Sequence, residues 1–215
     1  MMRLLPPTLA GKIRLGIMLA VLIGLALFFR PDRFLAAILY DKHEGDILFQ
    51  SLPRNDLTDA IEGISESQWS HCGVLVRDGE QWMVAEAIGI VHLTPLKLWL
   101  FRSRHCRFAA YRVDAMKDAD MPRLRTAIDA MIGKPYDYHY APDDEEIYCS
   151  ELVFRAFERG LGIKIGEWQK LRDLNWQPFE KFVRSMEDGA LPLEREMITP
   201  VALTRSPLVH RVSPW

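Results

Sequence analysis

The chain has 215 residues, of which 49% are hydrophobic, and it carries a net charge of -2 with a pI near 6.3. A chain of this size can bury one substantial hydrophobic core. Its lysines and arginines are dispersed among acidic residues, as on an ordinary solvated surface, so the sequence offers no basic patch for a nucleic acid partner.

The first 40 residues stand out by composition. Residues 15–29 (LGIMLAVLIGLALFF) are uncharged and lie between Arg14 and Arg30. A run of about 15 residues is short for a membrane span, which takes about 20, but snorkelling arginines and a second apolar patch at residues 34–40 make spanning feasible. We therefore expect residues 1–40 to form an uncleaved signal anchor with a transmembrane helix. The alternatives are a cleaved signal peptide, for which the bulky end of the run is a poor cleavage site, and a buried core helix.

The basic N-terminal tail favours an orientation with the N-terminus inside. This orientation predicts that residues 41–215 lie outside the cytoplasm, in the periplasm if the membrane is a bacterial inner membrane.

The first half of the remaining chain predicts one helix and several strands. Apolar residues at helical spacing predict a short amphipathic helix within residues 54–64, with Leu57, Ala60, Ile61 and Ile64 on one face. Short apolar runs predict strands at residues 47–50, 70–77, 81–87, 89–93 and 107–113. The run of three strands after residue 70 has connections too short for helical crossovers, and Asp78-Gly79 is a hairpin dipeptide, so we expect an antiparallel meander.

The second half predicts mainly helices, at residues 122–132, 149–159 and 176–186, followed by late strands at 198–203 and 208–212. Pro200 weakens the first of these strands. Internal repeats and low-complexity linkers are absent from the sequence, so residues 41–215 should form a single α+β domain with an antiparallel sheet packed on helices.

The three cysteines occupy different contexts. Cys72 lies in an apolar strand pattern, Cys106 lies beside basic residues, and Cys149 begins a predicted helix. The lack of any C-x-x-C motif argues against a zinc knuckle, a thioredoxin-type site or a haem attachment site. A disulfide between two of the cysteines stays open. Cys72 and Cys106 are interpreted as core or surface residues, and Cys149 as the candidate for chemistry.

The position of Cys149 at a helix N-terminus suits a nucleophile. The partial positive charge and unpaired N–H groups of the first turn stabilise a thiolate and can hold a developing oxyanion. The alternative is a small buried core residue, which is the commonest role of a cysteine without a disulfide.

A thiolate nucleophile requires a base, and His71 at the beginning of a buried strand is the best candidate among the histidines. Glu86 interrupts the next apolar strand. If Asp78-Gly79 forms the turn, residues 71 and 86 lie directly opposite each other with their side chains on one face. The carboxylate would then orient the imidazole, as the third member of a triad does. A hydrogen-bonded core histidine and an exposed strand glutamate are the alternatives.

Five segments carry a family resemblance: GDILFQ (45–50), WSHCGVLV (69–76), VAEA (84–87), GKPYDYHY (133–140) and YCSELVFRAF (148–157). In order and spacing they resemble the YiiX-like branch of the permuted papain-fold (NlpC-type) superfamily, over about residues 45–176. The resemblance implies a circularly permuted papain-like fold in which the histidine strand precedes the cysteine helix. It also implies that Cys149 is the nucleophile, His71 the base and Glu86 the orienting residue, and that Tyr148, Tyr136 and Asp137 shape the cleft.

By this resemblance we expect a cysteine peptidase or amidase that cleaves an amide, in a peptide or cell-wall-type substrate, through an acyl-enzyme. A lipid acyltransferase or lipase similar to the lecithin:retinol acyltransferase branch, and a non-catalytic envelope protein that binds ligands, are the alternatives. No cofactor or metal is expected. The acidic run at residues 143–146 lacks the alternating ligand pattern of a calcium loop, and H-E-x-x-H does not occur.

Overall fold

The computed structural model describes residues 9–29, 35, 39–141 and 143–213. A six-stranded antiparallel sheet with strand order β4-β3-β2-β1-β5-β8 forms its centre. The strands of this sheet are β1 (Ile47–Gln50), β2 (His71–Asp78), β3 (Gln81–Ile88), β4 (Ile90–Pro95), β5 (Phe108–Val113) and β8 (Val209–Arg211). The predicted α+β class with an antiparallel meander is therefore confirmed.

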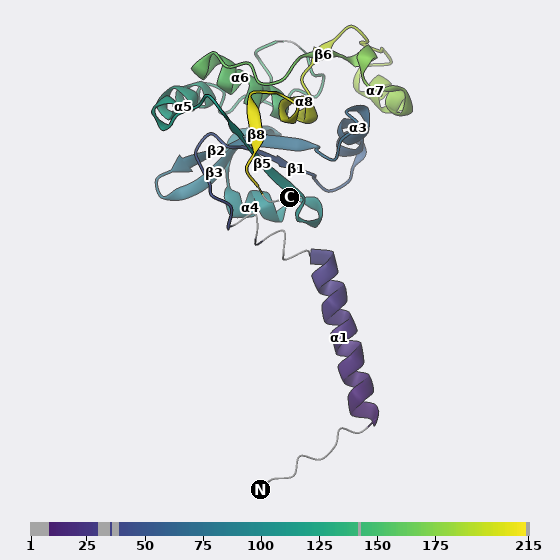
Figure 1. Ribbon diagram of the computed structural model, residues 1–215. Helices are drawn as coiled ribbons and strands as arrows, with labels where there is room; N and C mark the ends of the chain where they lie inside the picture. The colour runs from purple at the N-terminus through teal and green to yellow at the C-terminus, as the bar shows by residue number, and fades with distance from the viewer. Residues whose placement is uncertain (1–8, 30–34, 36–38, 142, 214–215) are drawn as a thin grey trace.

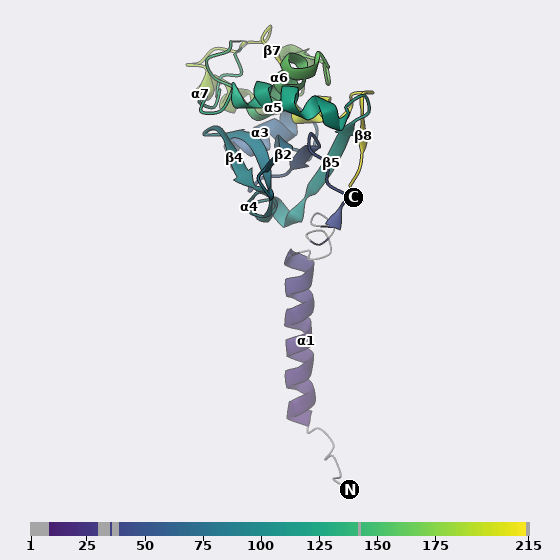
Figure 2. The ribbon, with the colours of Figure 1, turned by 90° about the vertical axis from the view of Figure 1, so that its left-hand side faces the viewer.

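Helices cover both faces of the sheet (Figures 1 and 2). On one face, α5 (Met121–Asp129) and α6 (Cys149–Leu161) pack on a core that includes Val74, Ala85 and Leu152. The other face is covered by α4 (Leu96–Phe101), a short helix that the sequence analysis did not predict, whose Trp99 is fully buried. Strand alternation thus divides the sheet into two apolar faces, as its period of two residues requires.

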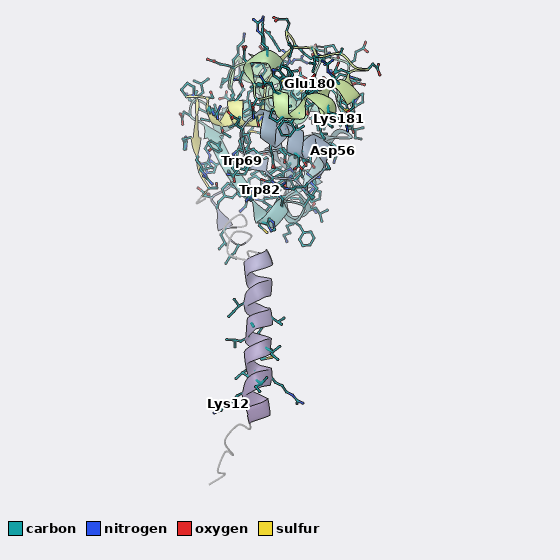
Figure 3. All side chains as sticks on the ribbon, turned by 90° about the vertical axis from the view of Figure 1, so that its right-hand side faces the viewer. Lys12, Asp56, Trp69, Trp82, Glu180 and Lys181 are labelled. Atoms are coloured by element: carbon teal, nitrogen blue, oxygen red, sulfur yellow. The ribbon has the colours of Figure 1, made fainter. Side chains whose placement is uncertain are left out.

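Three further helices and a small sheet complete the domain. Figure 3 places Asp56 of α3 and Glu180 and Lys181 of α7 on one flank of it. The elements are α3 (Asp56–Ile64), α7 (Glu180–Met186), α8 (Pro200–Thr204) and a two-stranded sheet of β6 (Gln169–Lys170) and β7 (Glu196–Met197). The prediction of a strand at residues 198–203 is wrong. Pro200 lies in the first turn of α8, where its missing N–H costs nothing, and the Thr199 hydroxyl caps that turn by accepting from Ala202 N at 3.2 Å.

Helix α6 ends two residues later than expected. Its C-cap is Gly162, whose φ of +73° is easily reached only by glycine. Gly160, the residue after the expected end of the helix, lies against α5, where an added Cβ would approach Leu124 Cα to 2.9 Å. Its missing side chain therefore permits close packing of α5 and α6.

The prediction of a transmembrane helix within residues 1–40 is wrong. Helix α1 (Leu9–Phe29) forms over the apolar run, but among the described residues no helix has the length and apolar character that crossing a membrane demands. Lys12 and Arg14 lie inside α1, and the uncharged remainder of about 15 residues would extend only about 22 Å, short of the ~30 Å hydrocarbon core. Part of the second apolar patch lies outside the described residues. The division of the chain at residue 40 and the location outside the cytoplasm stay predictions.

The predicted register of the β2–β3 hairpin is wrong by two residues. Gly79 and Glu80, rather than Asp78 and Gly79, form the turn, since Asp78 pairs with Gln81. Glu86 therefore lies opposite Gly73, and His71 lies diagonally across from it on the same face of the sheet. The error arose because the glycine of an Asp-Gly pair can be either the second or the first residue of a two-residue turn.

Candidate active site

Cys149 is the first residue of α6, and its side chain is buried against β2. The N-cap residue, Tyr148, makes no side-chain hydrogen bond to the first turn. The first N–H groups of a helix have no intrahelical partner, so those beside Cys149 can receive a negatively charged oxygen. Helix position thus gives the Cys149 sulfur both a positive field and hydrogen-bond donors.

The residues on either side of Cys149 hold the backbone of one residue, Ile198, in place. The Tyr148 hydroxyl accepts a hydrogen bond from Ile198 N at 3.0 Å, and the Ser150 hydroxyl donates to Ile198 O at 2.8 Å. All these groups are buried. The start of α6 is therefore fixed to the segment between β7 and α8, and the position of the Cys149 sulfur is fixed with it.

His71 and Glu86 meet across the hairpin despite their diagonal register. His71 Nε2 lies 2.6 Å from Glu86 Oε2, and both side chains are buried. Gly73 makes this contact possible, because it lies opposite Glu86 and a Cβ there would stand 3.3 Å from Glu86 Cβ and 2.6 Å from Ala85 O. The missing side chain at Gly73 leaves the imidazole room to reach the carboxylate.

Two further groups bind the Glu86 carboxylate. Thr94 Oγ1 donates to Oε1 at 2.5 Å, and Arg102 Nη2 donates to Oε2 at 2.5 Å. Burial alone would raise the pKa of Glu86, but the hydrogen bond and charge of His71, followed by those of Arg102, lower this pKa to about 2. Glu86 is therefore ionised at every physiological pH, and it stabilises the charged form of His71.

The surroundings of Cys149 and His71 stabilise the Cys149 sulfur as a thiolate and the His71 ring as an imidazolium. Burial disfavours charge on His71, but hydrogen bonds to Cys149 and Glu86 raise its pKa to about 9. The pKa of the Cys149 thiol is held well below its usual value, first by a hydrogen bond from the Cys72 thiol and, against burial, by His71. Because Nε2 faces Glu86, Nδ1 is the ring nitrogen left for the sulfur.

Cys72 is a residue of this site that sequence reasoning assigned to the core. The Cys72 thiol and backbone N–H lower the pKa of Cys149, and burial raises the pKa of the Cys72 thiol, which therefore keeps its proton. Its place next to His71 in the sequence was the available signal. Strand alternation sends the two side chains to opposite faces, which concealed that both reach Cys149. All three cysteines are thiols, with no disulfide among them.

Arg102, Thr94 and Ser150 were also missed. Arg102 caps the C-terminus of α4, a helix without a periodic sequence pattern. His92 lies opposite Glu86 in the β3–β4 pairing, with Nε2 at 3.8 Å from Glu86 Oε1. The polar interruption at Glu86 was a sequence signal for this cluster, but its partners follow only from the pairing of β3 with β4.

Tyr136, Asp137 and Tyr148, the three residues expected to shape the cleft, are buried. Tyr136 contacts Tyr140 through their hydroxyl groups at 3.3 Å, and Tyr148 packs on Tyr140 with ring centroids 4.5 Å apart. Asp137 accepts a hydrogen bond from His139 N at 2.7 Å. Their roles in catalysis stay predictions.

A cavity that is open to solvent adjoins Cys149. The neighbouring residues Tyr138, His139 and Tyr140 line it together with side chains of α3 and α7. Substrate can therefore approach the sulfur through a cavity that His71 and Glu86 do not line.

The chain is similar to proteins from Escherichia coli. A relative from Escherichia coli (strain K12), the uncharacterized protein YiiX, is 30% identical over 180 residues, which cover 82% of this chain and 89% of that protein. A crystal structure described as metalloprotein yiiX from Escherichia coli O157:H7 superposes with a TM-score of 0.78 at 30% identity, covering 82% of this chain and 99% of that one.

The term metalloprotein raises the question of a metal site here. Within the part of the chain that the structure describes, no group of three or more His, Cys, Asp or Glu side chains is arranged to hold a metal ion. Zinc sites, structural and catalytic alike, take three or four protein ligands.

A family model described as permuted papain-like amidase enzyme, YaeF/YiiX, C92 family, matches residues 41–213. This match includes every element of the sheet and the start of α6. The chain therefore belongs to the YaeF/YiiX family of permuted papain-like amidases and is a cysteine hydrolase.

Proposed function

We propose that the protein hydrolyses an amide through a thioester acyl-enzyme, with Cys149 as nucleophile, His71 as base and Glu86 as the orienting residue. The observation that carries this proposal is the buried sequence of contacts from Cys149 through His71 to Glu86. The Glu86 carboxylate is ionised and is fixed by hydrogen bonds from Thr94 and Arg102. It can therefore hold the orientation of the His71 imidazole and stabilise its positive charge.

In the first half-reaction, the Cys149 thiolate attacks the amide carbonyl carbon and the N–H groups at the start of α6 bind the resulting oxyanion. The His71 imidazolium then gives its proton to the departing amine nitrogen, the C–N bond breaks, and a thioester remains on Cys149. In the second half-reaction, neutral His71 takes a proton from water as the water oxygen attacks the thioester. The C–S bond breaks, a carboxylic acid leaves, and the thiolate and imidazolium return.

The amide substrate belongs, in this proposal, to a peptide or cell-wall-type molecule or to a lipid. An acyltransferase would follow the same first half-reaction but would pass the acyl group to an alcohol or amine. The identity of the second product therefore separates hydrolysis from transfer.

The test is mass spectrometry of the intact protein and of its products after incubation with simple acyl p-nitroanilides. We expect a Cys149-linked acyl adduct, release of p-nitroaniline and release of the free acid. Cys149→Ala should lower turnover by more than about a thousandfold. Cys106→Ala, at a partly exposed position outside the site, is the matched control and should leave turnover intact. Unchanged turnover in Cys149→Ala would refute the proposal.

A further inference from the structure

Helix α4 has an apolar face that nothing in the domain covers. The helix packs on the sheet through its other side, where Trp99 is fully buried. The side chains of Leu98 and Phe101 are 63% and 78% exposed, and their spacing of three residues places them on one face. Single exposed leucines are common on protein surfaces, but an exposed phenylalanine beside an exposed leucine on one short helix forms an apolar patch.

The segment around this patch carries positive charge. From Ala87 to Val113 the sequence contains one lysine and four arginines and neither aspartate nor glutamate. Three of the arginines form ion pairs with carboxylates from other segments. Lys97 and Arg107 have no such partner among the residues that the structure describes. Lys97 lies next to Leu98 on α4, so a cation borders the apolar patch.

Helix α1 emerges from the same end of the domain and is exposed along its length. Eight large apolar side chains of α1, between Ile13 and Ile23, are each more than half exposed. The helix reaches the domain at the turn of residues Arg104–Cys106, directly after α4. Figures 1 and 2 place α4 at the end of the domain that faces α1, and α6 and α7 at the opposite end. Two exposed apolar elements therefore adjoin each other.

The arrangement favours lipid over protein as the partner. Successive residues of a helix are turned by about 100°, so the exposed apolar side chains of α1 point in every direction around it. A folded partner covers one side of a helix, whereas lipid surrounds the part that is immersed in it. Leucine and phenylalanine bordered by lysine and arginine, as on α4, are typical of segments that lie at a membrane interface.

We infer that the surface formed by Lys97, Leu98, Phe101 and Arg107, here called the α4 surface, docks on an anionic phospholipid bilayer. The bilayer receives the two apolar side chains, and lipid phosphate groups pair with the two cations. Docking at the bilayer surface does not require α1 to cross it. Helix α6, which begins with Cys149, packs on the opposite face of the sheet from α4, so the docked surface is separate from the candidate active site.

The first experiment measures the partition of the full chain onto vesicles of phosphatidylcholine mixed with phosphatidylglycerol. Leu98→Asp and Phe101→Asp should each lower the partition coefficient at least about tenfold, because each loses apolar contact and adds a negative charge. Ile132→Asp, an exposed apolar position after α5, is the matched control and should leave it unchanged. Circular dichroism establishes that the variants are folded. Partition of both α4 variants equal to that of the wild type would overturn the inference, since α1 alone would then hold the protein on the vesicles.

A charge variant tests the choice of lipid. Lys97→Gln should lower binding to the mixed vesicles about fivefold and leave binding to vesicles of phosphatidylcholine alone unchanged. An equal effect on both kinds of vesicle would contradict pairing of this lysine with anionic lipid.

Hydrogen exchange of the full chain locates the contact. The mixed vesicles should slow backbone exchange in residues 96–107 and leave exchange in α7 unchanged. Slower exchange confined to α1 would overturn the inference. Slower exchange of residues 96–107 that depends on protein concentration, without vesicles, would also overturn it and would assign the α4 surface to a second copy of the chain.

Discussion

The two sides of Cys149 are built in opposite ways. On the side of the sheet, His71, Glu86, Thr94, Arg102 and Cys72 are joined by short contacts and buried hydrogen bonds. On the side of α3 and α7, apolar side chains face an open cavity. Folding therefore fixes the positions of the reacting groups, whereas the apolar side chains at the cavity remain available for contact with a ligand. Changes on the sheet side should alter the chemical step, and changes on the cavity side should alter the choice of substrate.

Among the variants on the sheet side, Glu86→Gln should have the largest effect. The amide keeps the shape of the carboxylate but removes the charge that helps to raise the pKa of His71. We expect kcat to fall by about 10²–10⁴-fold. In the wild type, activity is lost as pH rises through the pKa of His71, about 9, because the imidazolium then loses its proton. In Glu86→Gln that alkaline limb should move to lower pH.

The check for Glu86→Gln is a pH–rate profile together with circular dichroism to establish that the fold is retained. An unchanged alkaline limb in a folded variant would show that another group sets the charge of His71, and His92 would be the next residue to replace.

Cys72→Ala should have a smaller effect on the opposite limb of the profile. It removes the thiol that donates to the Cys149 sulfur, so the pKa of Cys149 should rise and the acidic limb should move up by about one pH unit. The expected loss of activity is small near neutral pH and reaches about tenfold below the acidic midpoint of the wild type. Cys106→Ala serves as the matched control. If the acidic limb of Cys72→Ala coincided with that of the wild type, the thiol would be a packing residue only.

Tyr148→Phe should leave the chemistry almost unaffected and lower stability. Without the hydroxyl, the buried Ile198 N–H loses its acceptor, which costs about 1–3 kcal/mol in the free energy of unfolding. Urea unfolding measures this loss. A large fall in kcat with little change in stability would instead give Tyr148 the role in the cleft that the family resemblance implied.

Much of the fold could be predicted from periodicity. The amphipathic pattern of residues 57–64 predicted α3, and the alternating apolar runs predicted β1, β2, β3 and β5 within one or two residues. Helix α4 was missed because six mostly apolar residues show no helical period, and α8 was mistaken for a strand because Pro200 can begin a helix as well as interrupt a strand.

Part of the candidate site could be predicted from the sequence, but one of the arguments used for it was wrong. Helix position identified Cys149, whereas the argument for His71 and Glu86 used a hairpin register that is wrong by two residues. The contact still forms, because a shift of two residues keeps both side chains on one face and Gly73 leaves space between them. Arg102 could not have been predicted, since its approach to Glu86 depends on where α4 folds over the sheet.

The cavity could not have been predicted from the sequence either. Its walls come from segments far apart in the chain, residues 57–64, 138–140, 182–187 and 192–200. The apolar face of each helix was consistent with ordinary core packing, and only the structure shows that α3 and α7 leave space between their faces.

The measurement that tests the central claim most directly is the rate of Cys149 alkylation by iodoacetamide across a pH range from about 4 to about 10, with Cys149→Ala as the reference. A thiolate stabilised by Cys72 and His71 should react at its full rate at neutral pH, with a midpoint well below the ordinary cysteine value of 9.0 and a further change near pH 9 as His71 loses its proton. A single midpoint at or above 9.0 would contradict the account, because Cys149 would then be an ordinary buried thiol.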